Sequence, residues 1–387
     1  MAPGPPLRIL FTAPAYYPAL AFGGPIWAAR ELNEGAVARG HEVDVLTTSL
    51  LDVRSGLSAG TRRDVVGGAR VTYLASPVRY RWMGITPTLP LELARLQRPD
   101  VAHVFGFRDP VGTFAAAWCR RRGIPYVLEP LGMFEPRVRK IRLKRRLDGS
   151  LYRGVWDGAA VIVATSEHER RQIVAAGAPA DRVEVRGNGF PAPGDGMRTG
   201  ALRRQLGLDG EPIVLYVGRL ARGKGVELLL ETARALPEVH LVLAGPDDGH
   251  GVMEDVRAAQ RDPITSGRVH TLRPSARPLD LYADADVFVL ASEGESFGMV
   301  AAEAAAAGTP VVVTDRCGVS EFLGDAGALV VPYDVMAVRA AIGKLISDEA
   351  LRERLRRGGW AAAERYSWST MVERQEELYR LAIARRA

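Results

Sequence analysis

The chain has 387 residues, of which 47% are hydrophobic and 25% charged, and its formal net charge is +6. This length exceeds what one hydrophobic core of about 150 to 200 residues needs, so it predicts two soluble domains. The sequence has no apolar run of about 20 residues and no signal-peptide pattern, and Cys119 and Cys317 fit neither a disulfide framework nor a metal-binding spacing, so we expect a cytoplasmic protein.

Short apolar runs alternate with amphipathic segments along the first half of the chain. The runs predict strands, and helical patterns such as 26–39 and 111–122 separate them. The predicted strands are 7–12, 42–48, 71–75, 101–105, 126–128, 161–164 and 183–185. A stretch rich in Pro and Gly, 191–200, then predicts a linker.

The alternation starts again after the linker. The predicted strands of this half are 213–217, 240–244, 269–272, 287–290, 311–314 and 328–331, and its helical patterns include 226–236, 297–307 and 336–346. Short apolar strands joined by helices are typical of parallel sheets that are covered on both faces.

We therefore predict an α/β fold with two Rossmann-like, doubly wound domains, 1–192 and 193–365. Their ligand site is expected where the carboxyl ends of the strands face each other across a cleft. The last segment, 366–387, is helical in pattern and has no strand after it, so we expect it to cross back to the first domain.

Basic side chains crowd into residues 137–146 with no acidic residue among them. They are Arg137, Arg139, Lys140, Arg142, Lys144, Arg145 and Arg146. Such a run can contact anionic lipid headgroups at the inner face of a cell membrane or a lipid-linked phosphate, and the alternative is a solvated helix face. No helix-turn-helix, zinc-finger or aromatic-interleaved pattern accompanies it, so we expect no nucleic-acid partner.

A turn rich in glycine and basic residues follows the first strand of the second domain. Gly218 allows close backbone approach, and Arg219 and Lys224 precede a helical pattern. Arg219 can bind two oxygens and Lys224 adds a point charge, which suits the charge that a diphosphate leaving group develops. Neither a Walker loop nor a G-x-G-x-x-G fingerprint is present. By itself the turn is more typical of a capped basic turn than of a phosphate site.

Two glutamates flank a helix start in the same half of the chain. Glu295 follows the strand 287–290, and Glu303 lies inside the next helix among alanines, where a carboxylate needs a polar partner. A helix start offers free N–H groups and a positive dipole end, which suit a phosphate. The carboxylates suit hydroxyl groups instead. The segment therefore predicts a site for a sugar joined to a nucleotide through a diphosphate.

With these motifs in place, the chain resembles the retaining glycosyltransferases of family 4, whose architecture of two Rossmann domains is called GT-B. The matching segments are spread over nearly the whole length, and their order and spacing together are specific. They are Phe22-Gly23-Gly24-Pro25, Arg39-Gly40-His41-Glu42-Val43, Asp100 to Gly106, Gly218-Arg219-Leu220, Lys224-Gly225, Ala244-Gly245-Pro246, Tyr282 to Phe288, Glu295 to Glu303, and Gly308-Thr309-Pro310.

The resemblance implies a role for each matching position. Its catalytic residues are His103, which contacts the donor sugar, Arg219 and Lys224, which bind the diphosphate, and Glu295 beside the sugar. Judged without the resemblance, His103 would more often be a structural histidine at a strand end. The donor-binding positions are Gly23, Gly24, Gly218, Ser296, Phe297, Gly298, Met299 and Glu303, of which Glu303 binds the ribose hydroxyls.

Two segments depart from the family pattern. Leu131 stands where relatives often carry histidine, so an acceptor or sugar contact there is not carried over. Arg273-Pro274-Ser275 stands where the family usually has a glycine, so base recognition is not carried over either.

Asp284 and Asp286 could suggest a metal site, but they lie at a helix end that enters a strand. We predict no metal and no cofactor, with a nucleoside diphosphate sugar as co-substrate.

The implied reaction moves a sugar from a nucleoside diphosphate sugar to an acceptor hydroxyl with retention of the anomeric configuration. A saccharide or lipid-linked acceptor would place the protein in cell-envelope, exopolysaccharide or glycolipid biosynthesis, and a small soluble acceptor is the alternative. The sequence shows no pair of nucleophile and acid/base carboxylates, which favours a front-face route. A nucleotide-sugar epimerase of the same fold and a non-catalytic binding protein are the competing classes.

Overall fold

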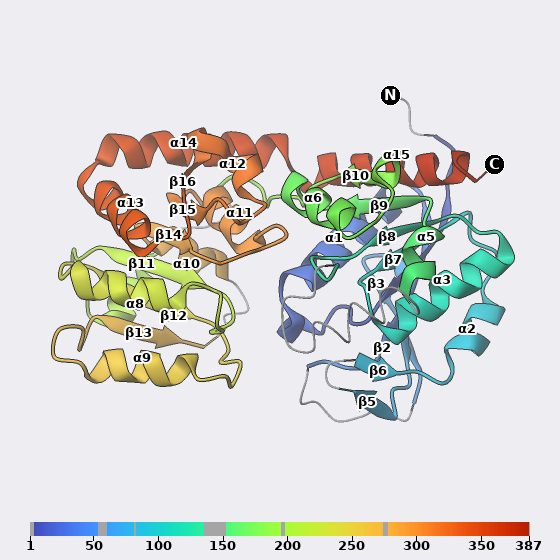
Figure 1. Ribbon diagram of the computed structural model, residues 1–387, viewed down its shortest axis with the longest axis horizontal. Coiled ribbons are helices and arrows are strands. Elements are labelled where there is room, and N and C mark those ends of the chain that lie inside the picture. The colour runs from blue at the N-terminus through green and yellow to red at the C-terminus, as the bar shows by residue number, and fades with distance from the viewer. Residues whose placement is uncertain are drawn as a thin grey trace. The chain divides into compact units, whose positions relative to one another are not determined.

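The computed structural model describes residues 4–52, 60–80, 83–134, 152–194, 198–273 and 278–386 (Figure 1). The chain divides into two compact units. Unit 1 consists of Met1–Asn188 with Trp368–Ala387, and unit 2 consists of Gly189–Ser367. The predicted boundaries at 192 and 365 lie within a few residues of these points. The basic run 137–146 lies outside the described residues.

Unit 1 is built on a sheet with the strand order β10-β9-β8-β7-β1-β2-β4-β3. Neighbouring strands are parallel, except that β3 runs antiparallel to β4. The strands are β1 (Arg8–Ala13), β2 (Glu42–Thr48), β3 (Arg62–Val66), β4 (Ala69–Leu74), β7 (Val101–Phe105), β8 (Tyr126–Glu129), β9 (Val161–Ala164) and β10 (Val183–Val185). A separate hairpin pairs β5 (Val78–Tyr80) with β6 (Met83–Ile85).

Helices cover both faces of this sheet. The helices of unit 1 are α1 (Gly24–Ala38), α2 (Leu89–Arg95), α3 (Pro110–Arg122), α5 (Arg153–Asp157), α6 (Glu167–Ala175) and α15 (Trp368–Ala384), with short turns η1 (Leu20–Phe22) and η3 (Ala180–Arg182). Alternate residues of β1 point to opposite faces: Phe11 packs in a core with α1 and α15, and Leu10 packs in a core with α3 and α5.

The C-terminal helix α15 is tied into unit 1 by a buried polar network. Arg186 forms a two-pronged ion pair with Glu129, at 2.7 and 2.8 Å, and also donates to Gln375 Oε1 at 2.6 Å. A buried ion pair needs well-aligned hydrogen bonds to offset the free energy that its two charges lose on leaving water. Burial alone raises the pKa of Glu129, yet the charge of Arg186 and the neighbouring His103 ring bring it below its ordinary value.

Unit 2 is built on a parallel sheet with the strand order β13-β12-β11-β14-β15-β16. The strands are β11 (Ile213–Val217), β12 (His240–Ala244), β13 (Val269–Leu272), β14 (Val287–Leu290), β15 (Val311–Thr314) and β16 (Ala328–Val331). The helices are α7 (Ala201–Leu206), α8 (Val226–Ala235), α9 (Val252–Arg261), α10 (Pro278–Asp284), α11 (Met299–Ala306), α12 (Ser320–Gly327), α13 (Val335–Ser347) and α14 (Glu349–Arg365).

Both units therefore have the doubly wound α/β architecture that the sequence predicts. Within the described residues, no helix is both long enough and apolar enough to cross a membrane. In unit 2 the order of the strands reverses between β11 and β14, and in unit 1 it reverses between β1 and β7. Ligands of open parallel sheets bind at the carboxyl ends of the strands at such reversals. These two edges hold the predicted site residues.

Candidate functional site

The loops after β11 and β14 meet at the strand reversal of unit 2. Gly225 has a φ of +78°, and a Cβ added to it would lie 1.9 Å from the carbonyl oxygen of Ala291. A residue with a side chain would push the two loops apart. The amide of Glu293 also donates to the carbonyl of Gly223 at 2.9 Å. These contacts hold the basic turn against the segment that carries Glu295.

Lys224 and Glu295 form an ion pair across these two loops. The Nζ of Lys224 donates to Oε1 of Glu295, which also accepts from Ser292 Oγ at 3.3 Å. Each of the two side chains is 23% exposed, so both have atoms within reach of a ligand. The structure thus brings together two of the four predicted catalytic residues.

Arg219 lies on the same turn with its side chain exposed. Its carbonyl accepts a hydrogen bond from the hydroxyl of Tyr216 at 2.8 Å, which fixes the backbone of the turn. No ion pair of its guanidinium occurs within the described part of the chain, whereas Arg222, three residues later, pairs with Glu227 and Asp255. Arg219 is therefore the arginine of this turn whose charge is not neutralised by a described carboxylate.

Glu295 is held in place by its own backbone. Its amide donates to the carbonyl of Arg316 at 3.1 Å, and its carbonyl accepts from Gly318 at 3.1 Å. The carbonyl of Phe297 accepts from Val319 at 2.8 Å, and the Phe297 side chain is 3% exposed within the core. The side chain of Phe297 therefore belongs to the core, and Ser296 lies between these two anchored residues.

Helix α11 begins directly after this segment. Gly298 caps it with a φ of +109°, and a Cβ there would lie 2.7 Å from Leu290. The helix starts at Met299, and its small side chains, Ala301, Ala302, Ala304, Ala305 and Ala306, are buried. The amide groups and positive dipole end of the first turn thus lie beside Ser296 and Glu295.

Glu303 has the polar partner that its alanine surroundings require. The hydroxyl of Tyr282, on α10, donates to Glu303 Oε2 at 2.8 Å. Burial raises the pKa of Glu303 to about 7, against the opposing effect of this hydrogen bond. Among the described residues, its other oxygen, Oε1, has no hydrogen-bond partner. A hydroxyl donor of a ligand would favour the ionised form.

Gly23 and Gly24 lie at the corresponding edge of unit 1, after β1. Gly23 precedes helix α1, and its amide donates to the carbonyl of Leu20 at 3.0 Å. A Cβ added at Gly23 would meet no atom within 4 Å. Pro25 lies in the first turn of the helix, as expected for a helix start. The predicted donor contacts of these two glycines stay predictions.

The surroundings of His103 argue against its predicted contact with the donor sugar. It is the third residue of β7, not its last, and its side chain is fully buried. Its Nδ1 lies 2.9 Å from the Tyr379 hydroxyl, and its Nε2 lies 3.2 Å from Glu129 Oε2. Burial lowers the pKa of His103, although Glu129 opposes this. These partners give His103 a place in the network that ties α15 to the sheet.

The carboxyl edge of unit 1 also holds strained residues that sequence reasoning did not identify as a site. Arg108 and Leu131 have φ angles of 60° and 55°, which are unfavourable for residues with a side chain. Arg108 donates to the carbonyls of Met133 and Phe134, and Gly132 donates to the buried carboxyl of Glu169. The loops after β7 and β8 are therefore fixed to each other, in the segment where the family often has histidine.

The two aspartates that could suggest a metal site have structural roles. Asp284 accepts from the amides of Gly200 and Leu202 at 2.7 and 2.9 Å. Asp286 pairs with Arg198 and Arg203. Within the described residues, no group of three His, Cys, Asp or Glu side chains is arranged to hold a metal ion.

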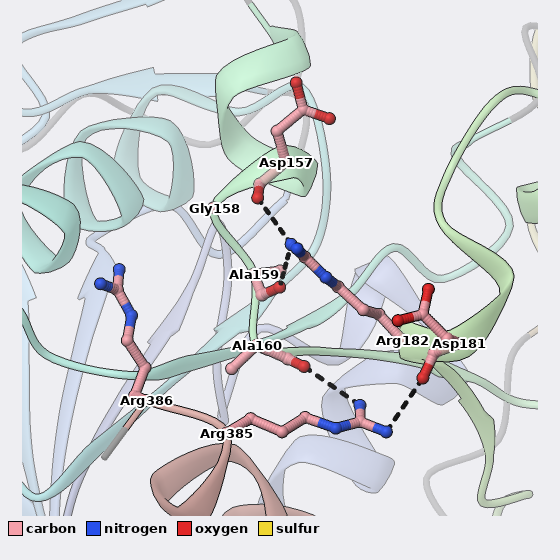
Figure 2. A pocket seen from close by; sticks show the side chains of 8 residues that line it. All are labelled: Asp157, Gly158, Ala159, Ala160, Asp181, Arg182, Arg385 and Arg386. Carbon is pink, nitrogen blue, oxygen red and sulfur yellow. Dashed lines mark hydrogen bonds between the residues drawn. The ribbon is translucent and has the colours of Figure 1, made fainter.

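A cavity of about 440 Å³ lies at the opposite edge of the unit 1 sheet, before β9 and β10 (Figure 2). Arg182 donates to the carbonyl of Asp157 at 2.8 Å, and Arg385 donates to the carbonyl of Asp181 at 2.9 Å. These arginines join the end of α15 to the strand starts. Because the cavity lies at the amino ends of the strands, it is separate from the edge that carries Gly23 and Gly24.

Comparison with known proteins places this geometry in a family. The family described as "Glycosyl transferase 4-like domain" matches residues 23–189, and the family described as "Glycosyl transferases group 1" matches residues 199–360. A D-inositol 3-phosphate glycosyltransferase of Xylanimonas cellulosilytica is 34% identical over 241 residues, which span 59% of this chain and 58% of that relative. The chain thus spans less than two thirds of the length of that relative.

Two further proteins match over nearly the whole length. An uncharacterized glycosyltransferase of Methanocaldococcus jannaschii is 28% identical over 95% of this chain and 96% of its own. The structure of HepE from Anabaena in complex with UDP-glucose superimposes with a TM-score of 0.76 at 19% identity, over 96% of this chain and 98% of that one. The two family matches and the shared fold show that this chain belongs to the family 4 glycosyltransferases with the GT-B fold.

Proposed function

We propose that the protein is a retaining glycosyltransferase that moves a sugar from a nucleoside diphosphate sugar to an acceptor hydroxyl. The observation that carries this proposal is the ion pair of Lys224 with Glu295 beside the start of α11, at the strand reversal of unit 2. The cation and the helix start suit the diphosphate of such a donor, and the anion suits its sugar.

Each group has a role that its chemistry supports. Lys224, Arg219 and the amides at the start of α11 bind the diphosphate, and their positive charge stabilises it most as the bond to the sugar breaks. Glu295 accepts hydrogen bonds from sugar hydroxyls, and the donor diphosphate competes with Glu295 for Lys224. Glu303 accepts from the ribose hydroxyls, with Tyr282 on its other oxygen.

The proposed transfer reaction needs no nucleophile from the protein. The bond between the anomeric carbon and the diphosphate oxygen breaks, and the acceptor oxygen forms its new bond to the same face of that carbon. The acceptor proton passes to the departing diphosphate. The sequence shows no pair of nucleophile and acid/base carboxylates, which supports this route.

The substrates are proposed from chemistry and from the relatives. HepE is described in complex with UDP-glucose, so a UDP-sugar is the first donor to test. The basic run 137–146 favours a lipid-linked or cell-envelope saccharide acceptor over a small soluble metabolite. A peripheral position at the inner face of the cell membrane follows from that acceptor.

Thermal unfolding with UDP-, GDP- and ADP-sugars tests donor binding first. A ligand at 100 times its dissociation constant stabilises the folded protein by about 2.7 kcal/mol, so the true donor class should raise the unfolding midpoint and the others should not. The same donor is then incubated alone. Slow hydrolysis supports a transferase, whereas a new nucleotide sugar shows an epimerase. Activity lost in chelator and restored by manganese would overturn the proposed independence from metal.

A further inference from the structure

The cavity at the amino edge of the unit 1 sheet has no part in the proposed transfer reaction. It lies between the turn that leads into β9, the turn η3 that leads into β10, and the residues that follow α15 (Figure 2). Its volume of about 440 Å³ falls within the range of about 300 to 1,000 Å³ that is typical of small-molecule sites. Gly158, Ala159 and Ala160 line one side, so no large side chain occupies that side.

Backbone carbonyls hold two arginines at this cavity. Arg182 donates to the carbonyl of Asp157 at 2.8 Å, and Arg385 donates to the carbonyls of Ala160 and Asp181 at 3.2 and 2.9 Å. Figure 2 shows the two side chains reaching the turn before β9 from different elements. A carbonyl oxygen orients a guanidinium but leaves its positive charge in place. Among the described residues, Nε and Nη2 of Arg182 have no partner, so they can donate to an anion.

A third arginine, Arg386, lines the cavity without a structural partner. Its amide donates to the carbonyl of Ile383 at 3.1 Å, but within the described part of the chain its guanidinium makes no hydrogen bond and no ion pair. Burial raises the pKa of Tyr126, and the charges of Arg120 and Arg386 oppose this effect. Because Tyr126 is the first residue of β8, the charge of Arg386 acts at the amino edge of the sheet.

The carboxylates around the cavity do not neutralise its arginines. Asp157 pairs with Arg153 at 3.2 Å, and Figure 2 shows its carboxylate pointing away from the guanidinium of Arg182. Glu184 pairs with Arg385 at 3.3 Å. Among the described residues, the charged side chains that line the cavity and their direct ion-pair partners are the arginines Arg153, Arg182, Arg385 and Arg386 and the carboxylates Asp157, Asp181 and Glu184. The excess of positive charge favours an anionic ligand.

We propose that this cavity binds a small phosphate monoester, with Arg182 and Arg386 donating to the phosphate and the organic part lying along the wall of small residues. The fork of N–H donors on an arginine matches the spacing of phosphate oxygens. Inorganic phosphate would fill only a small part of the 440 Å³, so the volume favours a monoester of about the size of a phosphorylated sugar. This site is separate from the carboxyl edges that the transfer reaction uses, and it does not depend on that reaction.

Chemical modification of arginines locates the bound anion. The full chain is treated with phenylglyoxal, which modifies accessible guanidinium groups, and peptide mass spectrometry follows each arginine. Glucose 6-phosphate at about ten times its dissociation constant should slow the modification of Arg386 by about 10-fold. Arg98, an exposed arginine of unit 1 that does not line the cavity, should react at an unchanged rate. Inorganic phosphate at the same concentration should protect Arg386 more weakly, and glucose should not protect it.

Calorimetric titration with glucose 6-phosphate tests the role of the guanidinium. Arg386→Gln should keep the wild-type unfolding midpoint, because the guanidinium has no partner among the described residues, and should bind about 10-fold more weakly. Arg98→Gln is the matched control and should bind as the wild type does. So should Lys224→Ala, since Lys224 belongs to the diphosphate site of unit 2.

Four results would overturn the proposal. They are equal binding by Arg386→Gln and the wild type, loss of binding in Lys224→Ala, no protection of Arg386 by glucose 6-phosphate, and equal protection by inorganic phosphate or glucose.

Discussion

Lys224 and Glu295 form an ion pair between the loops after β11 and β14, the two strands between which the order of the unit 2 sheet reverses. The pair is partly exposed, so its contribution to stability is small, about 0 to 1 kcal/mol. Because the pair lies beside the start of α11, its two side chains can also bind the donor. A diphosphate can replace Glu295 as the partner of Lys224, which frees the carboxylate to bind sugar hydroxyls.

Replacement of Lys224 by Ala should reduce turnover by about 100-fold or more, because a fixed cation at a developing charge is worth about 3 kcal/mol in the transition state. The unfolding midpoint should change little, since the ion pair is partly exposed. Steady-state kinetics and thermal unfolding measure the two effects. Arg222→Ala is the matched control: Arg222 lies on the same turn but pairs with Glu227 and Asp255, and its loss should leave turnover near the wild-type value. Equal losses in both variants would contradict the assignment.

Glu303→Gln should change stability in a manner that depends on pH. Burial raises the pKa of Glu303 from 4.5 to about 7, so between these values the folded protein holds a proton that the unfolded chain releases. Stability of the wild type therefore falls as pH rises through this window, and that of the variant does not. At pH 8 the variant should be more stable by about 1 to 3 kcal/mol, and at pH 4 this advantage should vanish.

The same Glu303→Gln variant should bind the donor about 10-fold more weakly at pH 8, because a carboxylate accepts ribose hydroxyl bonds more strongly than an amide does. Thermal unfolding at both pH values and calorimetric titration with the donor measure these opposite effects. A midpoint difference that stays constant from pH 4 to pH 8 would show that Glu303 does not titrate in this window.

Gly225→Ala should lower the stability of unit 2 by about 2 to 4 kcal/mol, because the new methyl group meets the carbonyl of Ala291 and the backbone has a positive φ. Gly207→Ala is a suitable comparison, since Gly207 has a φ of +68° but open space around it. That variant should lose only about 1 kcal/mol. Similar midpoints for the two variants would show that the loops after β11 and β14 are not in close contact.

His103→Ala should affect folding more than donor binding. The substitution leaves a cavity and removes a partner of Tyr379 and Glu129, which should lower the stability of unit 1 by about 2 to 4 kcal/mol. The KM for the donor should change less than about threefold, measured below the unfolding temperature. A large rise in KM with an unchanged unfolding midpoint would instead restore the contact with the donor sugar that the family resemblance implies.

Much of the fold follows from apolar periodicity. The six strands of unit 2 lie within the predicted ranges because buried parallel strands are continuous apolar runs. The strands β3, β5 and β6 were not predicted. β3 has the sequence RRDVV and is mostly exposed, and β5 and β6 are three residues each. Short or charged edge strands carry no apolar pattern that separates them from loops.

The site was predictable only in part, because partners far apart in the chain decide how its side chains are used. Lys224 and Glu295 were both predicted, but their direct pairing across 71 positions was not. The burial of His103 depends on Tyr379, on the last helix, and on Glu129. Sequence position alone does not tell which face of β7 this histidine occupies or what covers it.

If unit 2 holds a nucleoside diphosphate sugar for transfer, the protein releases nucleoside diphosphate from the sugar nucleotide that stabilises it. This release is measured for the wild type and for Lys224→Ala. We expect steady release by the wild type and at least about 100-fold less by the variant, with both proteins folded. Equal rates in the two proteins, or conversion of the donor into a different nucleotide sugar, would contradict it.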